Sequence, residues 1–292
     1  MRVASKRKNG FWQWKDKQRG LWYTIKKTTR KEPHMAQKRK VTATVISQKQ
    51  IGEQIYDLWL ETKLAKDAHP GQFVAVYPRG ESMLLPRPIS ICETDREKNR
   101  LRLVYRVAGK GTAEFSACKS GDRLDILGVL GNGFPVDKAK GKRVFLMGGG
   151  IGIPPMLELA KAIGEKKQIL LGYRNKDLFL EEDLAEYGDV YVATEDGSVG
   201  TKGNVMDIIK AYSLHADVIM ACGPMPMLRA IKKYAAENGI EAYISLEERM
   251  ACGVGACLGC VCRTTKVDAH SHVHNARICT EGPVFEAGEV EL

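Results

Sequence analysis

The feature that most constrains the fold is a group of cysteines near the carboxy terminus. Four of the eight cysteines lie between residues 252 and 262, too close together for all of them to pair without strain. The chain shows no secretory signal sequence, which favours a reducing compartment and a metal site over a disulfide framework. Residues 247–292 also contain too little apolar sequence for an independent core, so we expect a metal centre to hold this segment together.

The cysteines have the spacing of plant-type [2Fe-2S] proteins. Cys252, Cys257 and Cys260 form a C-x4-C-x2-C pattern, and Cys279 supplies a fourth thiol. Three glycines lie between Cys252 and Cys260, which suits a loop that turns tightly and directs backbone N–H groups at sulfur. The sequence therefore predicts a [2Fe-2S] cluster ligated by these four cysteines.

Two alternative centres remain open at this point. A structural zinc site usually pairs two short cysteine hooks, whereas only one is evident here; Cys262 is a fifth thiol that could replace a ligand. Three histidines, His270, His272 and His274, precede Cys279, so a Rieske-type ligand set is the second alternative. Alternating histidines on a polar loop are more often solvated, and the cysteines already supply four ligands.

The positive charge is concentrated at the amino end. The net charge is +10, yet residues 1–34 contain 11 Lys or Arg against 2 Asp or Glu, and the rest is nearly neutral. Three interpretations compete: a translation start upstream of the true one at Met35, a disordered basic arm, or an anchor or RNA-binding segment. We treat residues 1–34 as an extension outside the fold.

Short β-rich runs separated by turn residues follow this extension. Six strands are predicted, at Val41–Ile51, Gln54–Thr62, Gln72–Tyr77, Pro88–Cys92, Arg100–Val107 and Arg123–Val129. This spacing predicts a small closed antiparallel barrel, interrupted by a helix over Thr112–Lys119. In the fifth strand Leu101 and Leu103 alternate with Arg102, so we expect one face to meet the core and the other to present mostly polar groups.

From about residue 142 the rhythm changes to apolar runs that alternate with helix-length segments. The runs are Arg143–Met147, Gln168–Leu171, Asp189–Ala193, Asp217–Ala221 and Glu241–Leu246. This alternation predicts a five-stranded parallel sheet with helices on both faces. Helices are expected over Pro154–Ile163 and Pro224–Asn238, because proline is tolerated where a helix begins.

These patterns predict a multidomain chain. We expect a β-barrel domain over residues 35–139, an α/β domain over 140–246 and a small cluster domain over 247–292. No run of about 18 apolar residues occurs, so no membrane span is expected. Without low-complexity linkers, the three segments are expected to pack closely.

A glycine turn follows the first strand of the parallel sheet. It contains Gly148, Gly149, Gly150 and Gly152, and a helix start follows. Glycines let the backbone approach a pyrophosphate, and a helix N-terminus offers unpaired N–H groups and a partial positive charge. Ile153 occupies the third glycine position of a strict G-x-G-x-x-G, so a plain strand-to-helix turn is the alternative.

Three shorter motifs complete the candidate sites. They are Arg87-Pro88-Ile89-Ser90 in the barrel, Tyr105-Arg106-Val107 with Gly109-Lys110-Gly111-Thr112 downstream, and Cys222-Gly223-Pro224 in the sheet. Arginine suits a diphosphate, and a glycine-threonine turn that opens a helix can bind other phosphate oxygens. Taken alone, a short motif of this kind is more often a surface charge or a turn than a binding site. Cys222 lies at the end of a predicted parallel strand, which is where open sheets bind ligands. The alternative is that its thiol is simply buried.

Taken in this order, the motifs resemble those of the ferredoxin-NADP reductase superfamily. In that superfamily a flavin barrel carries R-P-x-S, and a nucleotide domain carries G-G-G-x-G-x-x-P and C-G-P. The carboxy-terminal C-G-V-G-A-C-x-G-C is similar to one branch, the electron-transfer subunits of type B dihydroorotate dehydrogenase. The resemblance covers residues 38–292; the interval before Cys279 is long for the family, and residues 1–34 have no counterpart in it.

The resemblance implies roles for the matching positions. Ser90 would lie beside the isoalloxazine ring of FAD. The implied FAD residues are Arg87, Pro88, Ile89, Ser90, Tyr105, Arg106, Val107, Gly111 and Thr112. The implied NAD residues are Gly148, Gly149, Gly150, Gly152, Cys222, Gly223 and Pro224. Cys252, Cys257, Cys260 and Cys279 would ligate the cluster.

The implied activity is that of an NAD-dependent flavin and iron-sulfur oxidoreductase subunit. The sequence offers no nucleophile-base pair, so no catalytic residue is assigned and the cofactors would carry the electron chemistry. An FMN-containing catalytic subunit would oxidise dihydroorotate, and electrons would pass through the [2Fe-2S] cluster and FAD to NAD+ in pyrimidine (UMP) biosynthesis. A cytoplasmic heterotetramer with two copies of each subunit is implied, with one FAD and one cluster in each copy of this chain, and no nucleic-acid or membrane partner.

Two other functions compete with this one. The first is a related flavin and [2Fe-2S] subunit of an NADH-dependent ferredoxin:NADP or sulfide-linked oxidoreductase. The second is a basic RNA-binding protein with a zinc knuckle, suggested by the basic and aromatic amino end. The nicotinamide preference is set by the resemblance alone, because Arg174 stands where an acidic residue is expected for NAD and Asp177 lies further on.

Overall fold

The computed structural model describes residues 38–80, 83–164, 167–267 and 272–292, and the backbone of three strands nearer the amino end. The chain divides into two units, Met1–Gln37 and Lys38–Leu292. In the first unit, β1 (Ser5–Lys8), β2 (Phe11–Lys15) and β3 (Trp22–Ile25) form an antiparallel sheet. The other residues of 1–34 lie outside the described part, so their interpretation as an extension stays a prediction.

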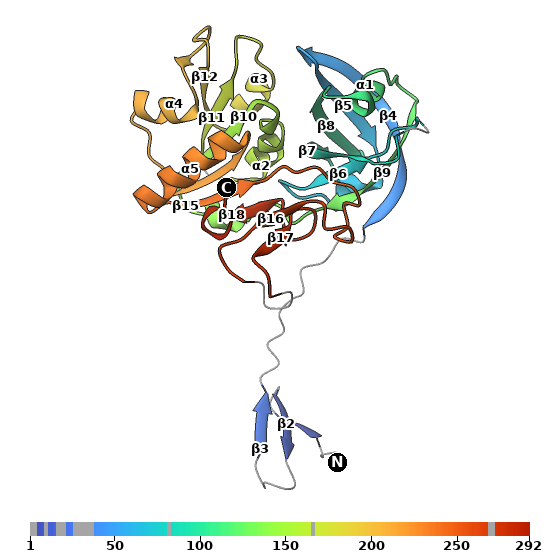
Figure 1. The fold of residues 1–292 in the computed structure, drawn as a ribbon, viewed down its shortest axis with the longest axis vertical. Helices are drawn as coiled ribbons and strands as arrows, with labels where there is room; N and C mark the ends of the chain where they lie inside the picture. Colours follow the sequence, from blue (N-terminus) through green and yellow to red (C-terminus); the bar gives the residue numbers. More distant parts are fainter. Residues whose placement is uncertain are drawn as a thin grey trace. The chain divides into compact units, whose positions relative to one another are not determined.

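The second unit begins with a closed β-barrel (Figure 1). Its strands are β4 (Arg39–Gly52), β5 (Ile55–Glu61), β6 (Phe73–Val76), β7 (Arg87–Asp95), β8 (Arg100–Arg106) and β9 (Arg123–Leu130). All neighbours are antiparallel, in the order β4-β5-β8-β7-β6-β9, which confirms the predicted six-stranded barrel. The inserted helix α1 spans Lys110–Ser116, and a single 3-10 turn, η1 (Lys63–Lys66), follows β5.

Strand β8 differs from its prediction on one face. Leu101 and Leu103 lie in the barrel core as expected, but Arg102 is only 8% exposed and Val104 only 2%. That second face is covered because Val104 shares a core cluster with the helices and strands that follow the barrel. The predicted alternation of β8 residues between two faces is therefore confirmed. The face that was expected to be polar is instead buried between the barrel and the α/β part of the chain.

A seven-stranded sheet follows the barrel. Its strands are β10 (Val144–Gly149), β11 (Lys167–Tyr173), β12 (Asp189–Thr194), β13 (Thr201–Lys202), β14 (Val218–Cys222), β15 (Glu241–Ser245) and β18 (Val284–Glu286). In the order β13-β12-β11-β10-β14-β15-β18, every pair is parallel except β15 with β18. All five predicted strands are present, and two short edge strands extend the predicted sheet.

Helices cover both faces of this sheet, as predicted. The helices are α2 (Pro155–Ala162), α3 (Glu181–Ala185), α4 (Val205–Ala211) and α5 (Met225–Asn238), with 3-10 turns η2 (Val136–Ala139) and η3 (Gly150–Gly152). Phe145 packs with α4 and α5 in one core cluster, and Leu146 packs with α2 and α3 in another. Successive strand residues thus point to opposite faces. Among the helices of the described residues, none is long and apolar enough to cross a bilayer.

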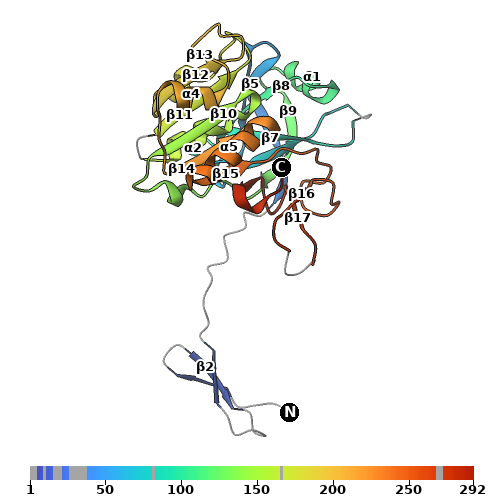
Figure 2. The ribbon, with the colours of Figure 1, turned by 60° about the vertical axis from the view of Figure 1, so that its left-hand side comes forward.

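The carboxy-terminal segment lies against both the barrel and the sheet (Figures 1 and 2). It contains the hairpin β16 (Val261–Arg263) and β17 (Asn275–Arg277), strand β18 and the turn η4 (Ala287–Glu289). Its apolar residues, including Ile278 and Phe285, join the core of the sheet rather than forming one of their own. This agrees with the expectation that the segment has too little apolar sequence for an independent core.

Candidate functional site

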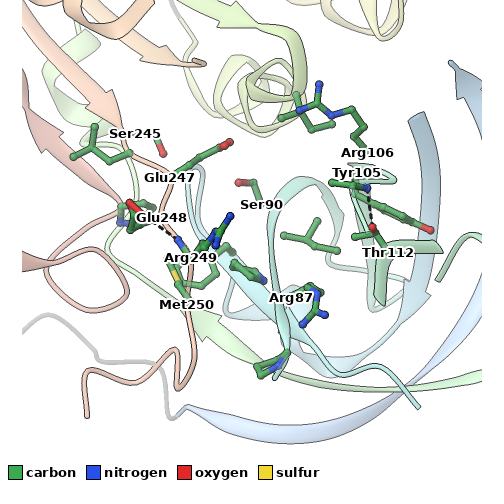
Figure 3. Close-up of a pocket in the computed structure, with 18 of the residues that line it drawn as sticks. Arg87, Ser90, Tyr105, Arg106, Thr112, Ser245, Glu247, Glu248, Arg249 and Met250 are labelled. Carbon is green, nitrogen blue, oxygen red and sulfur yellow. Dashed lines mark hydrogen bonds between the residues drawn. The ribbon is translucent and has the colours of Figure 1, made fainter. Parts of the chain in front are cut away.

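A cavity of about 700 Å³ lies between the barrel and the residues that follow β15, within the size range of small-molecule and cofactor sites. Figure 3 shows that Arg87, Ser90 and Thr112 on the barrel side face Glu247 and Arg249 across it. The predicted FAD residues that line the cavity are Arg87, Pro88, Ile89, Ser90, Tyr105, Arg106 and Thr112. The structure therefore brings together most of two motifs that are separated in sequence.

Two predicted FAD residues, Val107 and Gly111, do not line the cavity. Val107 packs against the barrel core, and its N–H donates to the Gln54 carbonyl at 2.9 Å. Gly111 lies against Arg87, where an added Cβ would be 2.9 Å from the guanidinium Nε. Gly111 thus allows α1 to approach the arginine that points into the cavity.

The turn that opens α1 is closed by Thr112. Its hydroxyl oxygen accepts the N–H groups of Ala108 and Gly109 at 2.9 and 3.2 Å, and the hydroxyl donates to the Gly109 carbonyl at 3.0 Å. Because these bonds engage the hydroxyl, the role of Thr112 in the structure is to close the turn.

Tyr105 forms a rigid part of the cavity wall. Its hydroxyl accepts a 2.8 Å hydrogen bond from Gln48 Nε2, and its ring stacks on Tyr56 with centroids 6.1 Å apart. Burial raises the pKa of Tyr105 above its usual value, and the bond from Gln48 only partly offsets this. Tyr105 is therefore a neutral phenol at physiological pH.

The opposite wall consists of residues that sequence reasoning missed. Ser245 to Met250 lead from the last parallel strand into the cysteine loop, and they line the cavity. Burial raises the pKa of Glu247, and the charge of Arg106 opposes this rise. No motif marks these residues; their position between a parallel strand and a ligand loop was the one available signal.

The glycine turn and the Cys222-Gly223-Pro224 turn meet at adjacent strands. Gly148 in β10 is in register with Cys222 in β14, and a Cβ on Gly152 would lie 2.6 Å from the Gly223 nitrogen. A Cβ on Gly149 would lie 3.0 Å from the Pro224 ring. The two predicted nicotinamide motifs therefore touch, and glycine is required for that contact.

The glycine turn also reaches the cavity. Ile151, inside the turn, lines the cavity, although the predicted glycines and Cys222 do not. The Cys222 thiol is 1% exposed, and burial raises its pKa well above that of a free cysteine. A bond with Ser245, which does line the cavity, opposes that rise. Cys222 is thus a buried neutral thiol next to the cavity wall.

Asp177, considered for a nicotinamide ribose, has another role in the structure. Its carboxylate accepts the Glu53 N–H at 2.5 Å and lies against Gly52 in the β4–β5 hairpin. Asn175 in turn accepts the Asp177 N–H at 2.9 Å. These bonds tie the loop after β11 to the barrel.

The four predicted cluster ligands lie in one loop and its immediate surroundings. Cys252 Sγ accepts the N–H groups of Val254 and Ala256 at 3.4 and 3.3 Å, within a loop whose Gly253 and Gly255 have φ values of +68° and +85°. Burial alone would raise the pKa of Cys252, but these N–H groups and Cys257 lower it to about 6. This environment favours a thiolate, the form that binds metal.

The four thiols influence one another. Cys252 interacts with Cys257, and Cys279 interacts with both Cys260 and Cys252. Burial and the contact with Cys260 raise the pKa of Cys279 to about 12. Across residues 38–80, 83–164, 167–267 and 272–292, no group of three or more metal-binding side chains converges on one point. These interactions link all four predicted ligands, which is the number of thiolates that a [2Fe-2S] cluster takes.

The remaining candidate ligands lie elsewhere. Cys262 packs against the core of the sheet, and burial raises its pKa. His272 and His274 are exposed, and His270 lies outside the described residues. Arg277, which sequence reasoning missed, donates to the Gly255 carbonyl at 3.1 Å and pairs with Glu281, so it helps to hold the cysteine loop.

Comparisons with known proteins identify the family of the chain. The family described as the iron-sulfur cluster binding domain of dihydroorotate dehydrogenase B matches residues 247–291. The "Dihydroorotate dehydrogenase B (NAD(+)), electron transfer subunit" of Bacillus cereus strain G9842 is 46% identical over 87% of this chain and 99% of its own length. The same values apply to the Bacillus anthracis strain A0248 protein of that name.

Solved structures show the same fold. A structure described as NADH-dependent reduced ferredoxin-NADP oxidoreductase has a TM-score of 0.77 and 31% identity, covering 85% of this chain and 89% of that chain. The ferredoxin reductase of carbazole 1,9a-dioxygenase has a TM-score of 0.60 and 20% identity, covering 70% of this chain and 68% of its own, and supports the fold alone. By its identity over nearly the whole length of its curated relatives, this chain belongs to the family of electron transfer subunits of dihydroorotate dehydrogenase B.

Proposed function

We propose that this chain passes electrons from the FMN of a dihydroorotate dehydrogenase catalytic subunit to NAD+, in pyrimidine (UMP) biosynthesis. One observation carries the proposal: the cavity is bordered by both other candidate sites. Met250, which lines it, lies two residues before Cys252, and Ile151, which also lines it, belongs to the glycine turn. A redox group in the cavity would therefore stand between a cluster and a nicotinamide.

The cavity would hold FAD. The guanidinium of Arg87 already donates to the Leu85 carbonyl at 2.6 Å and has further donors for a diphosphate. Ser90 would lie beside the isoalloxazine ring, with Pro88, Ile89, Tyr105 and Arg106 along the wall, and Val107, Gly111 and Thr112 shaping the strand end and turn behind them. FAD supplies the chemistry that links one-electron transfer to hydride transfer.

The glycine turn would bind NAD. Gly148, Gly149, Gly150 and Gly152 would let the pyrophosphate approach the start of α2, where the partial positive charge of the helix end favours an anion. Cys222, Gly223 and Pro224, at the end of the adjacent strand, would border the nicotinamide. Both turns lie at the carboxyl ends of parallel strands, where open sheets bind ligands.

Cys252, Cys257, Cys260 and Cys279 would ligate the [2Fe-2S] cluster, and the loop that carries three of them offers a surface to a partner. Val254 and Leu258 in this loop are 39% and 65% exposed, and Cys257 is exposed too. An exposed apolar surface at the cluster supports docking of the FMN-containing catalytic subunit there. Two copies of each subunit would form a heterotetramer.

The reaction would take place in the cytoplasm. All eight cysteines are free thiols, which is the usual state in a reducing compartment.

The test is to purify this chain alone and with its catalytic partner. The chain alone should catalyse NADH-dependent reduction of artificial acceptors, and dihydroorotate-dependent reduction of NAD+ should require the partner. Dihydroorotate oxidation by the isolated chain would contradict the proposal.

A second candidate is favoured by the 31% identity to the NADH-dependent ferredoxin-NADP oxidoreductase structure. In that case the partner recovered with this chain would carry an NADP-dependent activity. Dihydroorotate-dependent reduction of NAD+ by the recovered complex would decide for the first proposal.

A further inference from the structure

A buried carboxylate joins α2 to barrel strand β7. The side chain of Glu158, in α2, is 3% exposed. Its two carboxylate oxygens accept hydrogen bonds from the Thr94 N–H at 2.9 Å and the Thr94 hydroxyl at 2.7 Å. Arg96 also donates to this carboxylate at 3.1 Å and to the Ala68 carbonyl at 2.8 Å. A helix of the nucleotide-binding part is thus bonded directly to the backbone of a barrel strand.

A network of charges surrounds this bond. Glu93, next to Thr94 in β7, accepts Lys161 of α2 at 2.6 Å and Arg102 of β8 at 3.1 Å. Arg102 also pairs with Asp57 in β5 at 2.9 Å and with Asp183 in α3 at 2.9 Å. Both helices on this face of the sheet are therefore tied to the barrel through directional contacts.

The two joined elements lead to the two ligand sites. Strand β7 begins with Arg87 to Ser90 in the cavity, and Thr94 follows Ser90 by roughly 13 Å at the rise of a strand. Helix α2 begins directly after the glycine turn, and Glu158 follows Gly152 by roughly 9 Å at the rise of a helix. The bond between Glu158 and Thr94 is consequently a short connection between the proposed FAD and NAD sites.

A polar bond fixes this position in a way that apolar packing does not. Apolar contacts between a helix and a sheet are non-directional and permit small displacements, whereas a carboxylate that accepts one strand N–H selects one position along the strand. Burying a carboxylate is costly unless hydrogen bonds satisfy it. The buried hydrogen bonds between Glu158 and Thr94 are therefore better suited to fixing the distance between α2 and β7 than to increasing stability.

We propose that Glu158 is a positioning residue, whose bonds to Thr94 hold the glycine turn in register with the cavity and so align the nicotinamide with the flavin. The inference rests on the proposed function. In it Glu158 touches neither ligand. Its loss would leave both ligands bound while increasing the distance or tilt between their reacting rings.

The experiment compares the Glu158→Ala holoenzyme with wild type in rapid-mixing measurements of FAD reduction by NADH, expressed per bound FAD. We expect the rate constant at saturating NADH to fall about 100-fold, the typical effect of a misplacement near 1 Å. The Kd for NADH should stay within about 2-fold of the wild-type value, because Glu158 makes no contact with the bound nucleotide in this proposal. The absorbance band of the nicotinamide–flavin complex should weaken. Glu237→Ala, which removes an exposed carboxylate on α5, is the matched control.

A merely structural role would lower the FAD content or the Tm of the variant without changing the rate constant per bound FAD, and that result would overturn the inference. If Glu158→Ala does not fold, Thr94→Val decides, because it removes the hydroxyl bond but retains the backbone one. We expect about a 10-fold slower reduction for it, and a wild-type rate would overturn the inference. Wild-type protein whose FAD is not reduced by NADH would contradict the proposed function instead.

Discussion

Asn132 joins the barrel to the segment that carries the last cluster ligand. It lies just after β9, and its Nδ2 donates to the carbonyls of Glu281 and Val284 at 2.9 and 2.7 Å. Its Oδ1 accepts the Val284 N–H at 3.1 Å, and its own N–H donates to Gly282 O at 2.7 Å. The substitution Asn132→Ala removes the three side-chain bonds to this segment and keeps the backbone bond.

The size of the effect follows from those bonds. Each contributes about 0.5–1.5 kcal/mol net, and the exposure of Asn132 favours the lower part of that range, so we expect a loss of about 2 kcal/mol. This corresponds to about a 30-fold increase in the local opening equilibrium. Because Cys279 lies two residues before Glu281, iron should also be released to a chelator faster, while the FAD content stays unchanged.

Hydrogen exchange of the Leu246 amide in the holoprotein measures this opening, because that amide donates to the Pro283 carbonyl at 2.9 Å and keeps its acceptor in the variant. The amide should exchange about 30-fold faster in Asn132→Ala, and the amide of Leu103, inside the barrel, should keep its wild-type rate. The control is Asn238→Ala, which removes an exposed side-chain bond to the Tyr234 carbonyl at the end of α5. Unchanged protection of the Leu246 amide in Asn132→Ala would refute the reasoning.

Two further predictions concern the sheet. Gly152→Ala should weaken NADH binding at least about 10-fold in a titration without changing FAD content, because the new Cβ would lie 2.6 Å from the Gly223 nitrogen. Hydrogen bonds with Tyr243, Lys142 and Lys138 lower the pKa of Glu241 from 4.5 to about 2. Its stabilising contribution is therefore complete above about pH 4.5 and is lost as the pH falls towards 2. Urea unfolding should show that Glu241→Gln lowers the free energy of unfolding at pH 7, and that this loss shrinks as the pH falls from about 4.5 towards 2. An equal loss at pH 7 and at pH 2 would show that ionised Glu241 is not its cause.

The fold was predictable where its signals are local. The six barrel strands and five sheet strands are marked by apolar runs and turn residues within each segment, and the structure contains all eleven. Strand β18 has three residues, and its antiparallel pairing with β15 depends on where the cysteine segment docks. No local pattern encodes such a contact, which is why the sheet was predicted without this edge strand.

The same distinction applies to the site. The cluster cysteines are recognisable because their spacing is itself the chemical requirement, whereas the role of the residues from Arg87 to Ser90 was implied by the family resemblance. Glu158 looks like an ordinary polar helix residue in the sequence, and its burial arises only when α2 packs on β7. Glu247 lines the cavity from a connecting segment. Burial created by the packing of distant segments has no periodic pattern to reveal it.

The central claim is that four thiols hold a [2Fe-2S] cluster beside a bound flavin. The most direct test is metal and flavin analysis of the protein purified without oxygen, together with its electron paramagnetic resonance spectrum after reduction. We expect about two irons and one FAD per chain, with the signal of a reduced [2Fe-2S] cluster. Protein that contains zinc and no iron would contradict the account.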